Sequence, residues 1–169
     1  VTNHKRTYRI YREEGLQVRT KRRKKLTRPC VPMLVPDRVN QRWSMDFVSD
    51  QLANGRRFRV LNVADDYSRE CVQQVVDFSI SGQRLARELD RLAAHRPLPK
   101  AIVFDNGPEF TARAVREWLA RVNVKTLFIE PGSPWENGYI ESFNGKMRDG
   151  LLAGEIFYTL KEAQVLIEI

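Results

Sequence analysis

With 169 residues, the chain is long enough to form one sizeable hydrophobic core and an appendage. Its hydrophobic content of 42% and charged content of 30% are typical of a soluble protein. No run approaches the roughly 18 apolar residues of a membrane span, and no N-terminal stretch has a signal-peptide pattern, so we expect a cytoplasmic protein without a membrane partner.

Positive charge is concentrated at the start of the chain. The net charge is +8, and residues 1–30 contain 11 Lys and Arg against Glu13 and Glu14, so the other 139 residues carry −1. Such a basic arm can displace counterions from DNA, although a charge run is equally typical of a solvated tail. The candidate DNA contacts in this arm are Lys21, Arg22, Arg23, Lys24 and Lys25.

The arm also contains a predicted helix and is followed by a predicted linker. Lys5–Glu14 predicts a short helix that ends at Gly15, and three prolines in Thr27–Asp37 disfavour regular structure. We therefore expect a basic arm over residues 1–26, a proline-rich linker over 27–38 and a core over 39–169.

The core begins with alternating strands. From Gln41 the pattern has a period of two, with Trp43, Met45 and Phe47 on one face of a strand and Ser44, Asp46 and Val48 on the other. Asn54-Gly55 is a hairpin signal, so an antiparallel meander is expected. The following strands are expected at Arg57–Ala64 and Glu70–Val76.

Helices and strands alternate after this meander. In chain order the patterns predict a helix over Ser81–Arg96, a strand over Ala101–Phe104, a helix around Trp118, a strand over Lys125–Ile129, a helix carrying Glu141 and a final helix from a Thr159 and Glu162 capping box. This order predicts an α/β fold, a mixed five-stranded sheet flanked by helices.

Three acidic residues stand in different local settings. Asp46 lies inside a strand, where a buried carboxylate is costly, unless the strand lies at an edge and faces water. Asp105 opens DNGPEF at the carboxyl end of a central parallel strand, where ligands tend to bind, but this sequence is also ideal for a turn. Glu141 lies on a helix, and by itself a surface Glu indicates nothing.

Together the three acids are more informative. Carboxylates on adjacent central strands and on a facing helix can bind two Mg²⁺ ions for phosphoryl transfer, a site built from hard oxygen ligands. The two Cys, Cys30 and Cys71, and the two His, His4 and His95, are too few for a disulfide framework or a Cys/His zinc site.

Four segments, WSMDFVSD, VADDYSRE, VFDNGPEF and PGSPWENGYIESFNGKMRDG, carry a family resemblance. They resemble the DDE transposases of bacterial insertion sequences, specifically the integrase-like second reading frame of insertion-sequence family three, and the similarity runs through the whole chain. The 35 residues between Asp105 and Glu141 equal the family's usual spacing. The family is related to retroviral integrases and has a ribonuclease-H-like fold.

The resemblance implies specific roles. Asp46, Asp105 and Glu141 would be the catalytic triad and the ligands of Mg²⁺, for which Mn²⁺ can substitute. The arm would be the end of a helix-turn-helix DNA-binding region, and the core would be truncated at its C-terminus. The candidate DNA contacts near the acids are Arg148, Lys146, Trp135 and Asn144. For Trp135, packing that anchors its loop is an equal alternative to a DNA contact. Asp65 and Asp66 are further candidate ligands near the expected site, but a turn role is favoured for both.

The implied activity is transposition. We expect metal-dependent 3′-end cleavage and strand transfer on transposon ends and target DNA by a homo-multimer in the bacterial cytoplasm, associated with the nucleoid and without a small-molecule substrate. The alternative is an inactive remnant that only binds DNA.

Overall fold

The computed structural model describes residues 4–15, 35–105, 107–128 and 137–168 of a chain that divides into two compact units, Val1–Pro32 and Met33–Ile169. In the smaller unit, α1 (His4–Glu13) has no buried residue, and Gly15 follows it in the left-handed conformation with φ of 64°. The short basic helix predicted from the sequence is therefore confirmed, one residue earlier than expected. The predicted linker lies largely outside the described residues, and the predicted domain boundaries stay a prediction.

The larger unit is built on one sheet with the strand order β3-β2-β1-β4-β5. β1 pairs antiparallel with β2, and β2 with β3, whereas β4 is parallel to both of its neighbours. The mixed five-stranded sheet is therefore confirmed. Its strands are β1 (Arg42–Gln51), β2 (Arg57–Asp65), β3 (Cys71–Asp77), β4 (Ala101–Phe104) and β5 (Lys125–Phe128).

The turn between β1 and β2 fixes the register of the meander. Gly55 has φ of 80°, a conformation that favours glycine, and the Asn54 side chain accepts a hydrogen bond from Arg56 N at 2.9 Å. The hairpin predicted at Asn54-Gly55 is therefore present.

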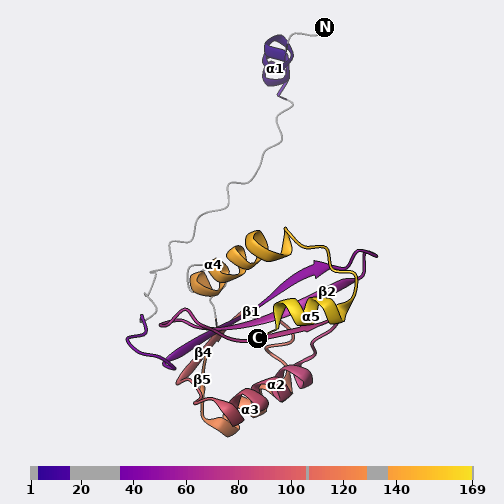
Figure 1. Cartoon of the computed structure of the whole chain (residues 1–169). Helices are drawn as coiled ribbons and strands as arrows, with labels where there is room; N and C mark the ends of the chain where they lie inside the picture. Colours follow the sequence, from indigo (N-terminus) through magenta and orange to yellow (C-terminus); the bar gives the residue numbers. More distant parts are fainter. Residues whose placement is uncertain (1–3, 16–34, 106, 129–136, 169) are drawn as a thin grey trace. The chain divides into compact units, whose positions relative to one another are not determined.

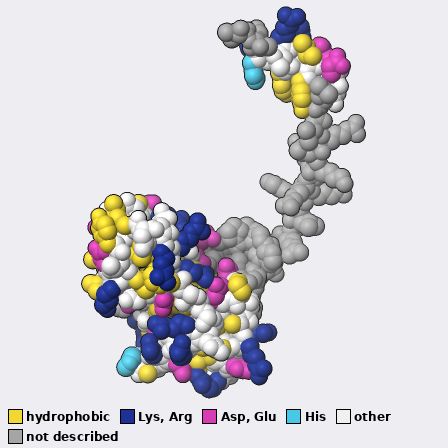
Figure 2. Space-filling model, turned by 90° about the vertical axis from the view of Figure 1, so that its right-hand side faces the viewer, with side chains coloured by type: hydrophobic (Ala, Val, Ile, Leu, Met, Phe, Trp, Pro, Cys, Tyr) yellow, Lys and Arg dark blue, Asp and Glu magenta, His cyan; other side chains and the backbone are white. Residues whose placement is uncertain are grey.

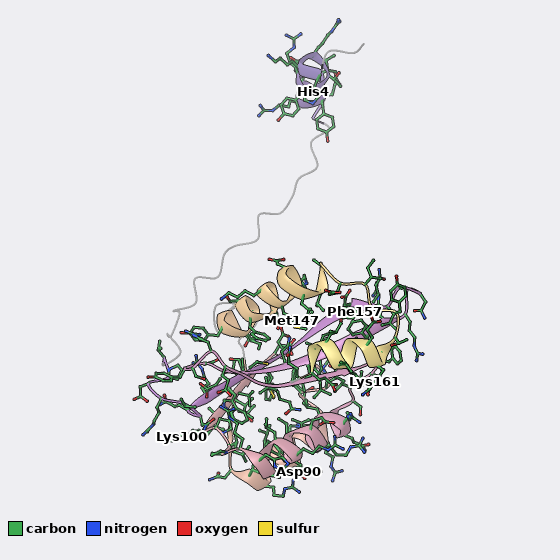
Figure 3. All side chains as sticks on the ribbon, in the orientation of Figure 1. His4, Asp90, Lys100, Met147, Phe157 and Lys161 are labelled. Carbon is green, nitrogen blue, oxygen red and sulfur yellow. The ribbon has the colours of Figure 1, made fainter. Side chains whose placement is uncertain are left out.

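Helices cover both faces of the sheet (Figure 1). α2 (Gly82–His95) and α3 (Arg113–Val122) lie on one face, and α4 (Gly138–Met147) and α5 (Leu160–Ile167) lie on the other, where a π-helical segment, η2 (Arg148–Leu152), continues α4. Figure 3 shows the same division, with Met147 and Phe157 on the α4 side and Asp90 on the α2 side. None of the described helices is long and apolar enough to cross a membrane.

Two helix starts use the caps that their sequences offer. Ser81 Oγ accepts a hydrogen bond from Arg84 N at the start of α2, and Thr159 Oγ1 accepts one from Glu162 N at the start of α5. The Glu162 carboxylate in turn accepts from Tyr158 N at 2.8 Å, one residue before the partner of an ideal capping box.

Alternation along the strands divides the apolar side chains between two cores. The core under α2 and α3 includes Trp43, Met45, Leu61, Val63, Val75, Ile102 and Phe104. The core under α4 and α5 includes Val48, Phe58, Val60, Val76, Met147 and Phe157. The face of β1 that carries Asp46 is therefore the face that α4 covers.

The surface of the larger unit carries both signs of charge. Figure 2 shows Lys and Arg side chains among Asp and Glu side chains on the face that it presents. Whether a Lys or Arg side chain can bind a ligand therefore depends on whether it already forms an ion pair with a neighbouring Asp or Glu.

Gly82 allows α2 to approach α3 closely. A Cβ atom at this position would lie 2.2 Å from Ala112 Cβ and 3.1 Å from the Glu109 carbonyl oxygen. We predict that Gly82→Ala lowers the free energy of unfolding by about 1–3 kcal/mol, because the two helix starts must move apart. Urea denaturation measures this change. The control is Gly150→Ala, whose Cβ meets no atom within 4 Å, and equal stability of both variants would contradict the prediction.

Candidate active site

A row of polar side chains crosses the face of the sheet that α4 covers. Asp46 of β1 lies directly opposite Asn62 of β2, and Asn62 lies opposite Gln74 of β3. Asn62 is 0% exposed and Gln74 is 6% exposed, so these amides depend on protein partners for their hydrogen bonds.

Asn144 of α4 completes a chain of hydrogen bonds over this row. Gln74 Nε2 donates to Asn62 Oδ1 at 2.9 Å, Asn62 Nδ2 donates to Asn144 Oδ1 at 2.7 Å, and Asn144 Nδ2 donates to Asp46 Oδ2 at 2.8 Å. An ionised carboxylate can only accept, so Asp46 sets the direction of every bond in the chain. Each amide therefore has one orientation that satisfies the network.

The environment of Asp46 disfavours its charge. Burial raises the pKa of the Asp46 carboxyl above the ordinary value of 3.8, the Phe47 N–H and the Asn144 amide oppose this effect, and the charges of Asp105 and Glu141 raise the pKa further. Asp46 is therefore within electrostatic range of the other two acids, although the three come from separate parts of the chain.

Asp105 is brought to the level of Asp46 by the parallel pairing of β1 and β4. Ser44 pairs with Val103, and Asp46 and Asp105 each follow two residues later. The Asp105 Oδ1 atom accepts a hydrogen bond from Gly107 N at 2.9 Å. A Cβ atom at position 107 would lie 2.8 Å from that oxygen, so glycine permits the close approach.

Glu141 and Arg148 are both exposed on the segment that carries Asn144. Glu141 lies in the first turn of α4, one turn before the buried Asn144. Arg148 begins η2, where the α-helical hydrogen bonding of α4 gives way to a π turn. α4 thus contributes an exposed carboxylate and a buried amide.

The three acids have no basic partner in the part of the chain that the structure describes. Among the described residues, no Lys, Arg or His forms an ion pair with Asp46, Asp105 or Glu141. Within the same part of the chain, no three His, Cys, Asp or Glu side chains lie close enough together to hold a metal ion as they stand. The oxygen donors suit Mg²⁺ chemically, and their assignment as its ligands stays a prediction.

Asp65 and Asp66 have other partners. Burial alone would raise the pKa of Asp65, but backbone N–H donors from Ser68, Asn40 and Tyr67 outweigh it and hold that pKa below its ordinary value. Asp66 is buried and pairs with the Arg42 guanidinium, and its Oδ1 atom accepts a hydrogen bond from Ser44 Oγ at 2.6 Å. Both carboxylates therefore stabilise the turn after β2.

The predicted DNA contacts have different positions. Arg148 and Lys146 are exposed, whereas Asn144 is 7% exposed and bonds protein groups on both sides of its amide. Trp135 and the basic run Lys21–Lys25 lie outside the described residues. The DNA-binding roles of all of these residues stay predictions.

Sequence reasoning missed Asn62 and Gln74. Both lie inside predicted strands at positions whose alternation assigns them to the same face as Val60 and Val76, a face that is otherwise apolar. A polar amide at such a position must find a buried partner, and this signal could have identified both residues.

The chain matches one family over most of its core. Residues 36–134 match the family model described as integrase core domain, and residues 122–169 match a second model with that description. A 31.7 kDa uncharacterized protein of insertion element IS407 from Burkholderia multivorans is 48% identical over 166 residues, covering 98% of this chain and 60% of the relative. A 39.2 kDa uncharacterized protein of insertion element IS476 from Xanthomonas euvesicatoria is 46% identical over 168 residues, covering 98% of this chain and 48% of the relative. The chain thus spans only part of the length of these relatives.

Solved structures show the same fold. The catalytic domain of Mos1 transposase, solved with raltegravir and Mg, matches with a TM-score of 0.63 and 19% identity, covering 76% of this chain and 69% of that chain. The likeness shows that the larger unit has the ribonuclease-H-like fold.

The amide chain predicts a coupled pair of substitutions. Asn62→Leu should lower the free energy of unfolding by about 1–3 kcal/mol, because Asn144 Oδ1 loses its donor and Gln74 Nε2 loses its carboxamide acceptor. Gln74→Leu should lower the free energy of unfolding less in the Asn62→Leu background than in the unaltered chain, since the hydrogen bond between the two amides is already lost. Chemical denaturation of the single and double variants measures the coupling.

The control for this cycle is Gln83→Leu, an exposed change on α2 that should alter stability by less than about 0.5 kcal/mol. Strictly additive effects of the Asn62 and Gln74 substitutions would contradict the shared network.

Proposed function

Because this chain belongs to the integrase core domain family, we propose that it is the catalytic core of a bacterial insertion-sequence transposase that cuts and joins DNA. The observation that carries the proposal is geometric: the pairing of β1 with β4 sets Asp46 and Asp105 at one level, and Asn144, one turn from Glu141 on α4, is hydrogen-bonded to Asp46. Asp46 lies on β1, Asp105 directly follows the parallel strand β4, and Glu141 lies on α4.

The proposed reaction consists of two phosphoryl transfers. In the first, water attacks the phosphorus at the end of the element, and the P–O bond that breaks leaves a free 3′-hydroxyl. In the second, that hydroxyl attacks a phosphodiester of the target DNA, and one P–O bond forms as another breaks. No covalent bond to the protein is required, so positioning and charge stabilisation supply the catalysis.

Asp46, Asp105 and Glu141 are the proposed ligands of Mg²⁺, for which Mn²⁺ can substitute. When bound, divalent cations stabilise the charge that develops on the attacking and leaving oxygens. The magnesium in the matched Mos1 structure supports this choice for the family. For this chain, the choice is supported by the absence of a basic partner for these acids among the described residues, because neighbouring like charges favour a cation.

The remaining residues would orient the acids and the DNA. Asn144 holds Oδ2 of Asp46, and the Phe47 N–H holds Oδ1, so the carboxylate plane is fixed relative to the sheet. Arg148 is exposed at the start of η2, directly after α4, and its guanidinium would contact a DNA phosphate. We also propose that the protein acts as a homo-multimer on transposon ends and target DNA.

Cleavage and joining of DNA that carries the element's terminal repeats tests this function. Asp46→Asn, Asp105→Asn and Glu141→Gln should each reduce both reactions at least about 100-fold, because each removes a group proposed to act in the transition state. The matched controls are Asp50→Asn on β1 and Glu155→Gln, which should retain activity. Wild-type rates in any triad variant would exclude the assignment, and DNA binding without cleavage by the unaltered chain would favour the DNA-binding remnant.

Thermal unfolding tests the cation site without catalysis. Mg²⁺ or Mn²⁺ at a hundredfold excess over its dissociation constant should stabilise the unaltered chain by about 2.7 kcal/mol, because the cation binds the folded state. The three triad variants should lose this gain, whereas Asp50→Asn should keep it. An equal gain in all variants would place the cation elsewhere.

A further inference from the structure

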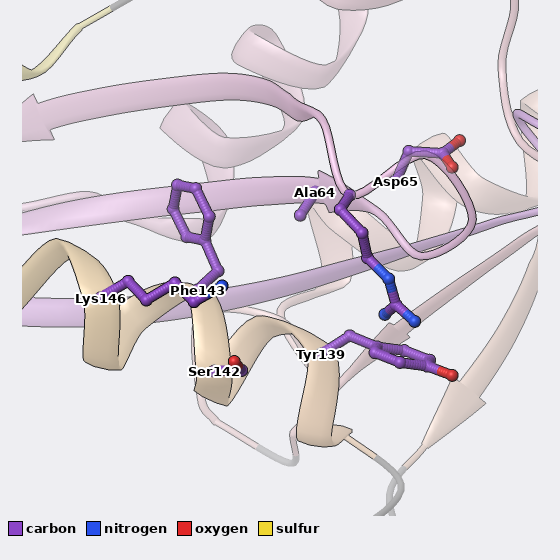
Figure 4. Close-up of a pocket in the computed structure, with 7 residues that line it drawn as sticks. Ala64, Asp65, Tyr139, Ser142, Phe143 and Lys146 are labelled. Carbon is purple, nitrogen blue, oxygen red and sulfur yellow. The ribbon is translucent and has the colours of Figure 1, made fainter.

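A second concave site lies between α4 and the turn that joins β2 to β3. It has a volume of about 350 Å³, within the lower part of the range for ligand pockets. Figure 4 shows Tyr139, Ser142, Phe143 and Lys146 along α4, with Ala64 and Asp65 on the strand side. Arg69 completes the lining.

Arg69 is held in place by the turn on which it lies. Its backbone has φ of 64°, and its N–H donates to the Asp65 carbonyl oxygen at 2.9 Å, while the Asp65 side chain accepts from two N–H groups of the same turn. The Arg69 guanidinium carbon lies 3.3 Å from the centroid of the Tyr139 ring. Stacking on an aromatic face leaves the in-plane N–H groups of a guanidinium available to a planar or tetrahedral anion.

Spacing along α4 separates this site from the acids. Tyr139, Ser142 and Lys146 follow one another at intervals of three and four residues and line the pocket. Glu141 and Asn144 occupy the neighbouring side of the helix, where Asn144 contacts Asp46. The pocket side extends over about 10 Å from Tyr139 to Lys146, given a rise of about 1.5 Å per residue.

The charges of the pocket favour an anion. Among the described residues, neither Arg69 nor Lys146 forms an ion pair with an acid. The acid in the lining, Asp65, already accepts from three backbone N–H groups. The neighbouring Asp66 pairs with Arg42, and the charge of Arg69 acts on it without forming an ion pair. Two cations and the Ser142 hydroxyl therefore remain as donors.

We propose that this pocket, defined by Arg69, Tyr139, Ser142 and Lys146, binds the phosphate backbone of a DNA strand beside the catalytic site. The inference rests on the proposed function, since it takes DNA as the ligand. Arg69 and Lys146 each contact a phosphate, and Ser142 donates to one of the phosphate oxygens. Contacts of this kind position DNA without reading its sequence.

The Tyr139 ring argues for the backbone over a base. The guanidinium carbon of Arg69 lies 3.3 Å from the centroid of the Tyr139 ring, and that of Arg42 lies 5.8 Å from the same centroid. A ring used in this way orients arginine and is not free to stack on a splayed base. The pocket therefore recognises charge and spacing.

Salt titration of DNA binding by the full chain tests the proposal. Each lost phosphate contact should lower the slope of log K against log salt by about 0.9. Arg69→Gln and Lys146→Gln should each show this loss on a duplex of arbitrary sequence. When salt rises from about 50 to about 200 mM, the fold-loss of DNA affinity should therefore be about 3.5 times smaller for each variant than for the unaltered chain. The double variant should show about twice the change in slope.

The matched controls are Arg87→Gln on α2, on the opposite face of the sheet, and Lys161→Gln on α5. Lys161 is labelled in Figure 3. Both remove one exposed charge and should leave the slope unchanged. Equal slopes for the pocket variants and the unaltered chain would overturn the proposal. Thermal unfolding of each variant shows that it is folded, and Lys146→Gln changes an exposed side chain, so it keeps the test decisive if Arg69→Gln fails to fold.

Lysine acetylation in the presence and absence of DNA gives a local readout. DNA should protect Lys146 several-fold from the reagent and leave Lys161 modified at the same rate, as measured by mass spectrometry. Equal modification of Lys146 with and without DNA would overturn the proposal. Protection of Lys146 that rises with protein concentration in the absence of DNA would also overturn it, because a second copy of the chain would then cover the pocket. These results do not depend on cleavage, so failure of the pocket is distinguishable from failure of the catalytic assignment.

Discussion

The hydrogen bond from Asn144 to Asp46 is the contact on which the geometry of the site depends. It joins α4 to the central strand of the sheet, and the bonds behind it extend through Asn62 to Gln74 on β3. Each of these amides is buried, so loss of one bond leaves a polar group without water to replace its partner. Glu141 lies one turn from Asn144, and its position relative to Asp46 is therefore fixed by the same network.

Identical side chains have opposite roles within this small region. Asp46 is half-buried and Asp66 is buried, and burial raises the pKa of both carboxyls. Asp66 has the Arg42 guanidinium beside it, whereas Asp46 has two further acids in range and amide donors only. Asp65 differs again, since backbone N–H groups satisfy both of its oxygens. The partners of each carboxylate, and not its residue type or burial, separate the structural acids from the proposed catalytic one.

The sequence predicted the framework because the framework depends on local patterns. Alternation in β1, the Asn54-Gly55 turn and the caps at Ser81 and Thr159 are all properties of neighbouring residues. Asp105 was predicted at the end of a central strand, and the parallel pairing of β4 places it there. The motifs that surround the three acids also indicated the family correctly.

The features that the sequence did not predict depend on the register between distant segments. The row from Asp46 to Gln74 exists only because the turns bring these three residues opposite one another, and Asn144 reaches it from a helix about 100 residues along the chain from Asp46. The contact between Arg69 and Tyr139 likewise joins a turn in left-handed conformation to the start of α4. Patterns of hydrophobicity contain no information about such pairings.

Because α4 is short and hydrogen-bonded along its length, its two polar sides move as one rigid body. A ligand that immobilises the Tyr139 side therefore also restrains Glu141, and a cation that draws in Glu141 alters the shape of the wall beside Arg69. Thermodynamic reciprocity requires that any such effect be equal in both directions, so occupancy of one side would tune affinity on the other by the same factor. If both proposals hold, binding of the DNA strand and of the metal ions would be mutually dependent through this single ten-residue helix.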